Sequence, residues 1–322
     1  MPTYKNDVEA IDDFVKKYTT LTKEINKVIV GQNDVIKDVL ISIFCKGHCL
    51  LVGVPGLAKT LLVNTLSQVL GLKYSRIQFT PDLMPSDIIG SEILGEDRHF
   101  KFIKGPIFAN IILADEINRT PPKTQSALLE AMQEHSITAA GKRYELEEPF
   151  FVLATQNPIE QEGTYPLPEA QLDRFMFNVW LDYPSFSEEV NVIKNTTSDH
   201  SYKPQVILNR EEILFFQDLV RRIPVSDNVI EYAVKLAAKT RPTKEHAHKM
   251  ANEYLSWGAG PRASQNLVLG AKCHAMINGK YSPDIVDVQA VSQAILRHRI
   301  VRNYKAEADN IAVEDIILEL TK

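Results

Sequence analysis

Cys49–Leu62 reads Cys-Leu-Leu-Val-Gly-Val-Pro-Gly-Leu-Ala-Lys-Thr-Leu-Leu, and this stretch decides the fold. Its apolar run Leu50–Val52 predicts a short strand, Gly53–Ala58 a loop of small residues, and the residues after Lys59 a helix. Backbone N–H groups in such a loop can approach phosphates closely, and the helix N-terminus adds positive potential. The order of strand, loop and helix is therefore what a phosphate-binding loop requires.

The loop departs from the usual pattern G-x-x-x-x-G-K-[ST] at one position, because Ala58 precedes the lysine. We expect Lys59 to reach the outer phosphates of a nucleotide and the Thr60 hydroxyl to ligate Mg²⁺. An ordinary strand-to-helix turn that contains Lys-Thr is the alternative. The predicted strand and helix on either side favour the phosphate-binding loop. Its residues are Gly53, Val54, Pro55, Gly56, Leu57, Ala58, Lys59 and Thr60.

Composition bounds the class of protein. Of 322 residues, 44% are apolar and 24% charged, as in soluble globular proteins, and the length allows two domains. The 36 basic and 41 acidic side chains give a net charge of −5, which argues against a surface evolved for nucleic-acid phosphates. No apolar run has membrane-spanning length, and Met1–Ala10 does not read as a signal peptide. Three cysteines are too few for a disulfide framework, so we expect a cytoplasmic protein.

The predicted strands before residue 183 are almost continuously apolar. This is typical of a parallel sheet with helices on both faces. Polar segments at 79–108 and 135–149 fit this pattern poorly and read as insertions, the second as a hairpin. We therefore predict an α/β fold whose sheet has five parallel strands, at His48–Val52, Tyr74–Gln78, Asn110–Ala114, Phe150–Ala154 and Met176–Trp180.

Helical signals surround and follow these strands. Helices are predicted at 7–28, from about Asp34, after Lys59, and from Pro121 with Thr120 as N-cap. Beyond residue 183 helices dominate, with a single further strand predicted at Ile300–Tyr304. Pro261 and Pro283 are predicted to lie in first turns. The chain therefore divides into an α/β core at 1–183 and a smaller α-helical domain at 184–322.

Two adjacent carboxylates, Asp115 and Glu116, follow the apolar run Ile111–Ala114. A carboxylate at the end of a buried strand can hold Mg²⁺ and its waters, and the next residue can orient or deprotonate a water that attacks the γ-phosphate. A surface Asp-Glu pair after a strand is common, but together with Lys59-Thr60 the signal is strong. Because parallel sheets bind ligands at their carboxyl edge, we expect the two motifs to stand side by side there.

Three further residues are candidates for the same chemistry. Asn157 follows a predicted strand and can contact the γ-phosphate or the attacking water; alternatively, it is a turn residue that caps the bend at Pro158. Arg174 offers a guanidinium that can stabilise transition-state charge, as an arginine finger does; alternatively, it forms a surface pair with Asp173. Arg262 can reach a nucleotide, or it is a solvated first-turn residue.

The loop Gly53–Thr60, including Ala58, resembles the Walker A motif of the MoxR family of AAA+ ATPases. The MoxR family belongs to a clade of AAA+ proteins that carry an insert in their second helix. Residues 92–104 correspond to that insert, and residues 135–149 correspond to the loop before the first sensor. The resemblance implies a P-loop NTPase core followed by an α-helical lid. Other stretches that resemble the family are spread over essentially the whole chain, at Phe79–Asp87, Asp115–Lys123, Ala154–Pro158, Gly163–Phe175 and Pro261–Ser264.

The resemblance also implies roles for single residues. Asn157 would be the first sensor, Arg174 the finger that acts on the ATP of a neighbouring subunit, and Arg262 the second sensor. The family forms rings that are usually hexameric. Its members often work with proteins that carry a von Willebrand A domain, in metal-cofactor insertion or complex maturation. The family's adenine-binding segment corresponds to Val30, Gly31 and Gln32.

We therefore expect a magnesium-dependent ATPase that uses hydrolysis to remodel a protein client. In its site Lys59 and Thr60 hold phosphates and metal. Asp115 holds the metal, and Glu116 activates water. A nucleic-acid motor is one alternative, kept open by Lys142-Arg143 in the predicted hairpin and disfavoured by the net charge. A nucleotide-gated scaffold with little turnover is the other, and the intact Glu116 argues against it.

Overall fold

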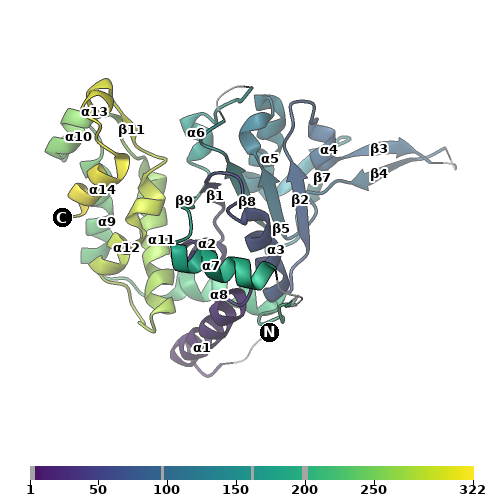
Figure 1. Ribbon diagram of the computed structural model, residues 1–322, viewed down its shortest axis with the longest axis horizontal. Coiled ribbons are helices and arrows are strands. Elements are labelled where there is room, and N and C mark those ends of the chain that lie inside the picture. Colours follow the sequence, from purple (N-terminus) through teal and green to yellow (C-terminus); the bar gives the residue numbers. More distant parts are fainter. Residues whose placement is uncertain (1–3, 96–97, 161–162, 198–201) are drawn as a thin grey trace.

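A parallel sheet with strand order β2-β5-β8-β1-β9 lies at the centre of the molecule (Figure 1). The computed structural model describes residues 4–95, 98–160, 163–197 and 202–322. Each of the five predicted strands is confirmed, with ends within two residues of the prediction. The strands are β1 (Cys49–Val52), β2 (Tyr74–Gln78), β5 (Ile111–Asp115), β8 (Phe151–Gln156) and β9 (Phe177–Trp180).

Alternate residues of the sheet face two different cores, which explains why its strands are apolar throughout. Leu51, together with its neighbours of the same parity, packs in the larger core with α1, α2 and α3. Leu50 points the other way, into a second core under α4 and α5. Successive side chains of a strand point to opposite faces, so both faces are covered. These helices are α1 (Asp7–Ile25), α2 (Asn33–Phe44), α3 (Lys59–Val69), α4 (Pro85–Ile89) and α5 (Pro122–Glu134).

The start of α5 corrects one prediction. The helix begins at Pro122, and Pro121 is its N-cap, with φ −56° and ψ 152°. A residue that precedes proline is pushed out of the helical region by the proline ring, so Pro121 cannot be the first helical residue. Thr120 is not the cap; it is buried, and its hydroxyl donates to the carbonyl of Thr80 at 3.1 Å.

Both predicted insertions contain a two-stranded antiparallel hairpin. The first, β3 (Gly90–Leu94) with β4 (Phe100–Lys104), projects from the body of the molecule (Figure 1). The second, β6 (Ser136–Ala139) with β7 (Lys142–Glu145), confirms the hairpin predicted at 135–149. Phe102 and Tyr144 stack with ring centroids 4.5 Å apart, so the two hairpins contact each other.

In the described part of the chain after residue 183, the regular structure is helical apart from one short antiparallel pair of strands. The strand predicted at Ile300–Tyr304 is only β11 (Val301–Arg302), and it pairs with β10 (Leu255–Trp257), which the sequence pattern did not predict. Pro261 is the first residue of its helix, as predicted. Pro283 is not in a first turn, because Asp284 after it is the N-cap and accepts the N–H of Val286.

The remaining helices complete the chain, and no described helix has both the length and the apolar character that crossing a bilayer needs. A short turn, η1 (Ile117–Arg119), follows β5. The others are α6 (Glu169–Leu172), α7 (Phe186–Thr196), α8 (Arg210–Arg222), α9 (Asp227–Lys239), α10 (Lys249–Tyr254), α11 (Pro261–Ile277), α12 (Ile285–Leu296), α13 (Tyr304–Ala308) and α14 (Val313–Thr321).

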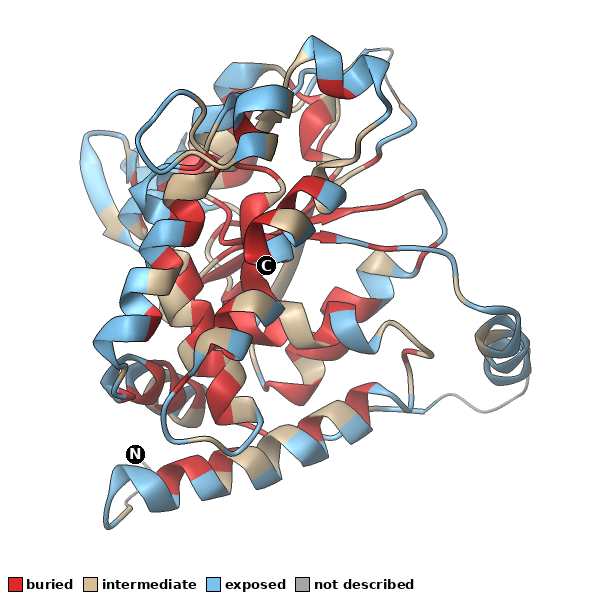
Figure 2. Ribbon diagram, turned by 90° about the vertical axis from the view of Figure 1, so that its left-hand side faces the viewer, coloured by how far each residue is buried: buried red, intermediate tan, exposed pale blue. Residues whose placement is uncertain are grey.

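The larger core continues from the sheet into the C-terminal helices. Phe14 on α1 contacts both Phe44 on α2 and Phe216 on α8, with ring centroids 4.9 and 5.0 Å apart. Figure 2 shows the buried residues gathered in the middle of the molecule. Because these aromatic contacts join residues on both sides of position 183, the C-terminal helices are packed on the core rather than tethered to it.

A partly buried carboxyl group on α2 gives a stability prediction. Burial raises the pKa of Asp38, on α2, to about 7, and nearby Asp34 adds to the rise while Lys37 and Arg297 oppose it. The folded state therefore binds this proton more tightly than the unfolded state, and the contribution of Asp38 to the free energy of unfolding falls as the pH rises from about 4 to about 7. We expect Asp38→Asn to raise that free energy at pH 8 by on the order of 1–4 kcal/mol.

Urea unfolding at pH 5 and pH 8 measures the effect. Asp34→Asn on the same helix is the control, because its side chain is 93% exposed, and we expect a change within about 0.5 kcal/mol. An unaltered pH dependence in Asp38→Asn contradicts the prediction.

Candidate nucleotide site

The loop between β1 and α3 is held closely against the sheet. The N–H of Gly53 donates to the carbonyl of Gln156 at 3.2 Å, and a Cβ on Gly53 would lie only 3.0 Å from the Leu181 side chain. The Lys59 ammonium turns back over the loop and donates to the carbonyl of Gly53 at 2.5 Å. Partial burial lowers the pKa of Lys59, while Asp115 and other nearby carboxylates oppose that shift.

The first turn of α3 suits a phosphate group. No side chain caps this eleven-residue helix, so its N–H groups are not taken by a cap. Unpaired N–H groups and the helix dipole together favour an anion at this end. The hydroxyl of Thr60 and the carboxylate of Asp115 are hard oxygen ligands of the kind that Mg²⁺ prefers, with nucleotide phosphates and water as its other ligands. These residues therefore fit a nucleotide bound with Mg²⁺.

Ala58 adopts the left-handed conformation that glycine has in the usual loop pattern, with φ +55° and ψ 24°. We expect Ala58→Gly to raise the free energy of unfolding by about 0.5–1 kcal/mol. The left-handed conformation costs alanine about 1–2 kcal/mol, which glycine avoids. The larger conformational entropy of glycine in the unfolded state reduces this gain by about 0.4–1 kcal/mol. Ala308→Gly, at an exposed position in α13, is the urea-unfolding control, because glycine there relieves no strain and should lower the free energy of unfolding by about 0.5–1 kcal/mol. A free energy of unfolding that does not rise in Ala58→Gly contradicts the prediction.

Asp115 ends β5 with both carboxylate oxygens engaged. Oδ1 accepts the Thr155 hydroxyl at 2.6 Å, and Oδ2 accepts the Arg76 guanidinium at 2.6 Å. The same Thr155 oxygen accepts the N–H of Glu116 at 2.8 Å. Thr155 therefore fixes both carboxylate residues relative to β8.

Glu116 has a strained backbone and a restrained side chain. Its φ of +58° lies in the left-handed region, which non-glycine residues occupy at a cost and often at functional sites. Its Oε2 accepts Gln78 Nε2 at 2.9 Å and lies 3.2 Å from a guanidinium nitrogen of Arg119. Arg119 also pairs with Glu160, which raises the pKa of the guanidinium. Glu116 is thus held by groups from β2 and η1.

The strand order corrects the expectation that the two motifs stand side by side. Both lie at the carboxyl edge of the sheet, but β8 runs between β1 and β5. The end of β8 joins them instead, because Gln156 accepts from Gly53 while Thr155 contacts Asp115. Asn157, the next residue, is buried at this edge.

Asn157 combines features of both interpretations of it. Its Oδ1 accepts the N–H of Ile159 at 3.2 Å, so the side chain does brace the bend at Pro158. Its Nδ2 has no hydrogen-bond partner among the residues that the structure describes. An Asn side chain has two donors on that nitrogen, which leaves them available to a phosphate oxygen or a water.

The segment Val30–Gln32 lies beside the loop. Gln32 Nε2 donates to the carbonyl of Leu57 at 3.4 Å. A Cβ on Gly31 would lie 2.6 Å from a carboxylate oxygen of Glu188, so the start of α7 covers this segment. The predicted adenine segment is therefore next to the predicted phosphate loop.

The structure does not bring Arg174 and Arg262 to this edge. Cys49 of β1 pairs with Phe177 of β9, and Val52 with Trp180, so the loop follows the carboxyl end of this strand pair while Arg174 precedes its amino end. Four strand residues span about 13 Å, and the two features lie at opposite edges of the sheet. Arg262 lies near Arg174, because it pairs with Asp173 at 2.9 Å.

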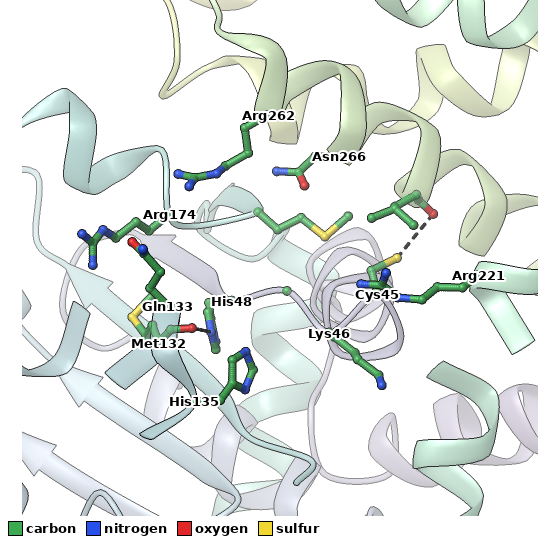
Figure 3. A pocket seen from close by; sticks show the side chains of 13 residues that line it. Cys45, Lys46, His48, Met132, Gln133, His135, Arg174, Arg221, Arg262 and Asn266 are labelled. Atoms are coloured by element: carbon green, nitrogen blue, oxygen red, sulfur yellow. Dashed lines mark hydrogen bonds between the residues drawn. The ribbon is translucent and has the colours of Figure 1, made fainter. Parts of the chain in front are cut away.

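Both arginines line a cavity of about 220 Å³ at the amino edge (Figure 3). Arg174 NH1 donates to the carbonyl of Leu129 at 2.5 Å, and Arg174 forms no ion pair with a described residue. The alternative of a surface pair with Asp173 is therefore wrong, since Asp173 pairs with Arg262 and Arg299. Arg262 is half-exposed and ion-paired rather than simply solvated.

Sequence reasoning missed the groups that hold the two carboxylates. Gln78 is the last residue of a predicted strand, and a polar side chain at that carboxyl edge was a usable signal. Thr155 lies two residues before Asn157, and no role was assigned to it from the sequence. Nothing in the sequence indicated that Arg299 would pair with Asp173.

Comparisons with known proteins agree with this geometry. Residues 48–177 match a family model described as the ATPase family associated with various cellular activities (AAA), and residues 247–320 match one described as an AAA lid domain. A crystal structure of a presumed ATPase from Cytophaga hutchinsonii superposes with a TM-score of 0.91 at 43% identity, and the alignment covers 97% of this chain and 95% of that one. The predicted α/β fold with a helical lid is confirmed.

Two curated relatives cover most of the chain. It is 43% identical over 295 residues to Chaperone MoxR1 of Mycobacterium tuberculosis, which covers 91% of this chain and 78% of that protein. It is 42% identical over 302 residues to the uncharacterized protein YeaC of Bacillus subtilis, with 92% and 91% covered. These similarities extend through both the sheet and the C-terminal helices.

Proposed function

This chain belongs to the MoxR family of AAA+ ATPases, and from that premise we propose that it hydrolyses ATP with Mg²⁺ in a ring of identical subunits, usually six, and thereby remodels a protein client. Residues 1–183 would form the nucleotide-binding core and 184–322 the lid. One observation carries the proposal. Lys59, Asp115 and Glu116 share one edge of the sheet, while Arg174 stands at the opposite edge, where it would meet the nucleotide of a neighbouring subunit.

The loop and the first turn of α3 would bind the phosphates. Lys59 would exchange its bond to the Gly53 carbonyl for one to the outer phosphates, while Val30–Gln32 would lie beside the adenine. Thr60 and Asp115 would hold Mg²⁺, which when bound offsets charge on the phosphate oxygens. Both residues supply hard oxygen ligands of the kind that Mg²⁺ prefers, which supports this role.

Glu116 would orient or deprotonate the attacking water. Its Oε2 is held by Gln78 and Arg119, so its direction is fixed before a nucleotide arrives. The free Nδ2 of Asn157 would contact the γ-phosphate or that water. Both functions are exerted from the carboxyl edge, in the subunit that binds the nucleotide.

Arg174 and Arg262 would act across the subunit interface. They lie together at the amino edge, because Arg262 pairs with Asp173, the residue before Arg174, and neither reaches the loop of its own chain. Arg174 would supply the transition-state charge, as an arginine finger supplied in trans does. No carboxylate among the described residues pairs with its guanidinium, which leaves the guanidinium available for phosphate oxygens. Arg262 would serve the same nucleotide from the lid.

A protein client fits the surface better than nucleic acid does. Arg143 in the second hairpin already pairs with Glu145 at 3.0 Å. The tip of the first hairpin instead exposes Leu94 and Phe100, with 61% and 71% of their surfaces accessible. Exposed apolar groups on a projecting element are typical of protein-binding sites. A client with a von Willebrand A domain is our proposal from the family.

Steady-state ATPase rates test the proposal. We expect the rate per chain to rise steeply over the protein concentrations at which rings form in analytical ultracentrifugation, and chelation of Mg²⁺ to abolish it. Single- or double-stranded DNA should leave the rate within about twofold. Full activity in a demonstrated monomer contradicts the trans arrangement, and strong, salt-sensitive stimulation by DNA favours a nucleic-acid motor instead.

A further inference from the structure

Arg299, just after α12, is a buried cation whose hydrogen bonds all go to two short segments. Its side chain is 1% exposed. Nε donates to Asp173 Oδ1 at 2.7 Å, and NH1 donates to the carbonyl of Met176 at 3.1 Å and to that of Ile295. NH2 donates to the carbonyls of Asp173 and Phe175 at 3.2 and 2.6 Å. All five N–H donors of the guanidinium are used.

Four of these five bonds end on the segment Asp173–Met176, which contains Arg174. The carbonyls immediately before and after Arg174 are therefore both bonded to one lid side chain. His298 adds a further bond, because its Nε2 lies 3.0 Å from the carbonyl of Phe175. A carbonyl only accepts, so Nε2 is the donor, and burial lowers the pKa of His298 well below its usual range, which keeps the ring neutral.

Stability alone does not account for this arrangement. Burial lowers the pKa of Arg299 to about 10, and Asp173 only partly offsets the cost of burying the charge. Apolar side chains of similar volume often stabilise a fold as well as, or better than, a buried ion pair. A planar fork with five fixed donors does, however, hold the backbone that it binds in one geometry, which lysine cannot do.

We propose that Arg299 is a positioning residue: it ties the lid to the backbone on both sides of Arg174 and so sets the direction in which this arginine meets the neighbouring subunit's nucleotide. The inference rests on the proposed function, in which Arg174 acts in trans. A displacement of α12 relative to β9 would move the finger with it. The lid of one subunit would thereby control hydrolysis in the next.

Mixed rings test the proposal, because they separate the two sides of a site. A Lys59→Ala chain lacks a working loop but keeps its arginines, and we call it the finger donor. An Arg174→Ala chain keeps its loop, and we call it the loop donor. We expect an equimolar mixture to hydrolyse ATP well above either variant alone. A mixture no faster than its components contradicts the trans arrangement itself. Because this mixture contains native Arg299, that result is distinct from a failure of the role of Arg299.

Arg299→Gln is then introduced into one donor at a time. In the finger donor we expect it to lower the rate of the mixture at least tenfold, with an unchanged KM for ATP. In the loop donor the loss should stay under about twofold. A merely structural defect would act on both sides, so equal losses, or no loss on either side, overturn the proposal.

Two further variants keep the test decisive. Arg297→Gln, two residues away, is the matched control: Arg297 pairs with Glu314 at 3.4 Å and makes no hydrogen bond to Asp173–Met176, so the finger donor should keep its rate. Where Arg299→Gln fails to assemble, His298→Phe carries the test, because it keeps a ring at this position and removes only the bond to the Phe175 carbonyl. An asymmetry of at least threefold between the donors supports the role of this lid contact, and symmetric effects overturn it.

Discussion

Replacing Arg174 by alanine is expected to lower the ATPase rate at least about 100-fold while the Kd for ATP stays within about threefold. The reason is geometric. Arg174 lies at the amino edge of the sheet, away from the loop that we propose binds ATP in its own chain, so ATP binding should not need it. Hydrolysis should need it, because in the proposed ring this guanidinium would stabilise the charge that develops on the phosphoryl group transferred in the neighbouring subunit.

Nucleotide titrations and steady-state rates on assembled rings measure the two quantities separately. Arg221→Ala is the matched control, since Arg221 lines the same cavity and we expect a change of no more than about twofold. Arg174→Lys keeps the charge without the planar fork and should recover only a small part of the rate. Loss of ATP binding in Arg174→Ala would contradict the geometry, and so would a rate close to that of the native chain.

Replacing Glu116 by glutamine is expected to lower the rate by about 100- to 10,000-fold, again with ATP affinity retained. Glutamine has nearly the same shape and can still meet Gln78, but it cannot accept a proton from water. The variant should therefore bind ATP, assemble and stall before hydrolysis. Single-turnover rates with radiolabelled ATP measure the step directly.

The control for this variant is Glu130→Gln, a carboxylate on the exposed surface of α5, where we expect no change. A loss of less than about tenfold in Glu116→Gln would assign the water-activating role elsewhere. The stalled variant is also the natural bait for a client, because a chaperone-type ATPase that holds ATP should retain its partner. Mass spectrometry of what it captures, compared with the native chain, would identify the client.

Most strands of the sheet could be predicted because the residues of each strand carry the signal for it. Runs such as Ile111–Asp115 are apolar at every position, and a buried parallel strand requires that pattern whatever its neighbours are. The three-residue β10 carries no comparable signal, because only Leu255 of its residues is buried. The predicted start of α5 is one residue too early, because Pro122 keeps Pro121 out of the helical conformation.

The residues of the candidate site likewise fall into two groups, those that a local motif reveals and those that only the fold brings together. Lys59, Thr60, Asp115 and Glu116 are found in short motifs because one strand end or one loop supplies each set. Their supporting contacts join distant parts of the chain: Thr155 bonds to Asp115 across 40 positions. Strand order decides such contacts, and a single sequence does not contain it.

The contact between the lid and the segment that carries Arg174 was the hardest feature to predict. Arg299 and Asp173 are 126 positions apart, and both look like ordinary charged residues in the sequence. The prediction that Arg174 acts on a neighbour came from a resemblance. The register of β1 against β9 supplies an independent physical reason for it, because it places Arg174 at the edge away from the loop of its own chain.

The composite site is the central claim, and a titration of Lys59→Ala chains against Arg174→Ala chains tests it most directly. Neither variant alone should exceed about one hundredth of the native rate. Random assembly of an equimolar mixture pairs an intact loop with an intact neighbouring arginine at roughly a quarter of the interfaces, so the rate should recover to about that fraction and peak at equal amounts. A mixture that hydrolyses ATP no faster than its two components apart would contradict the account.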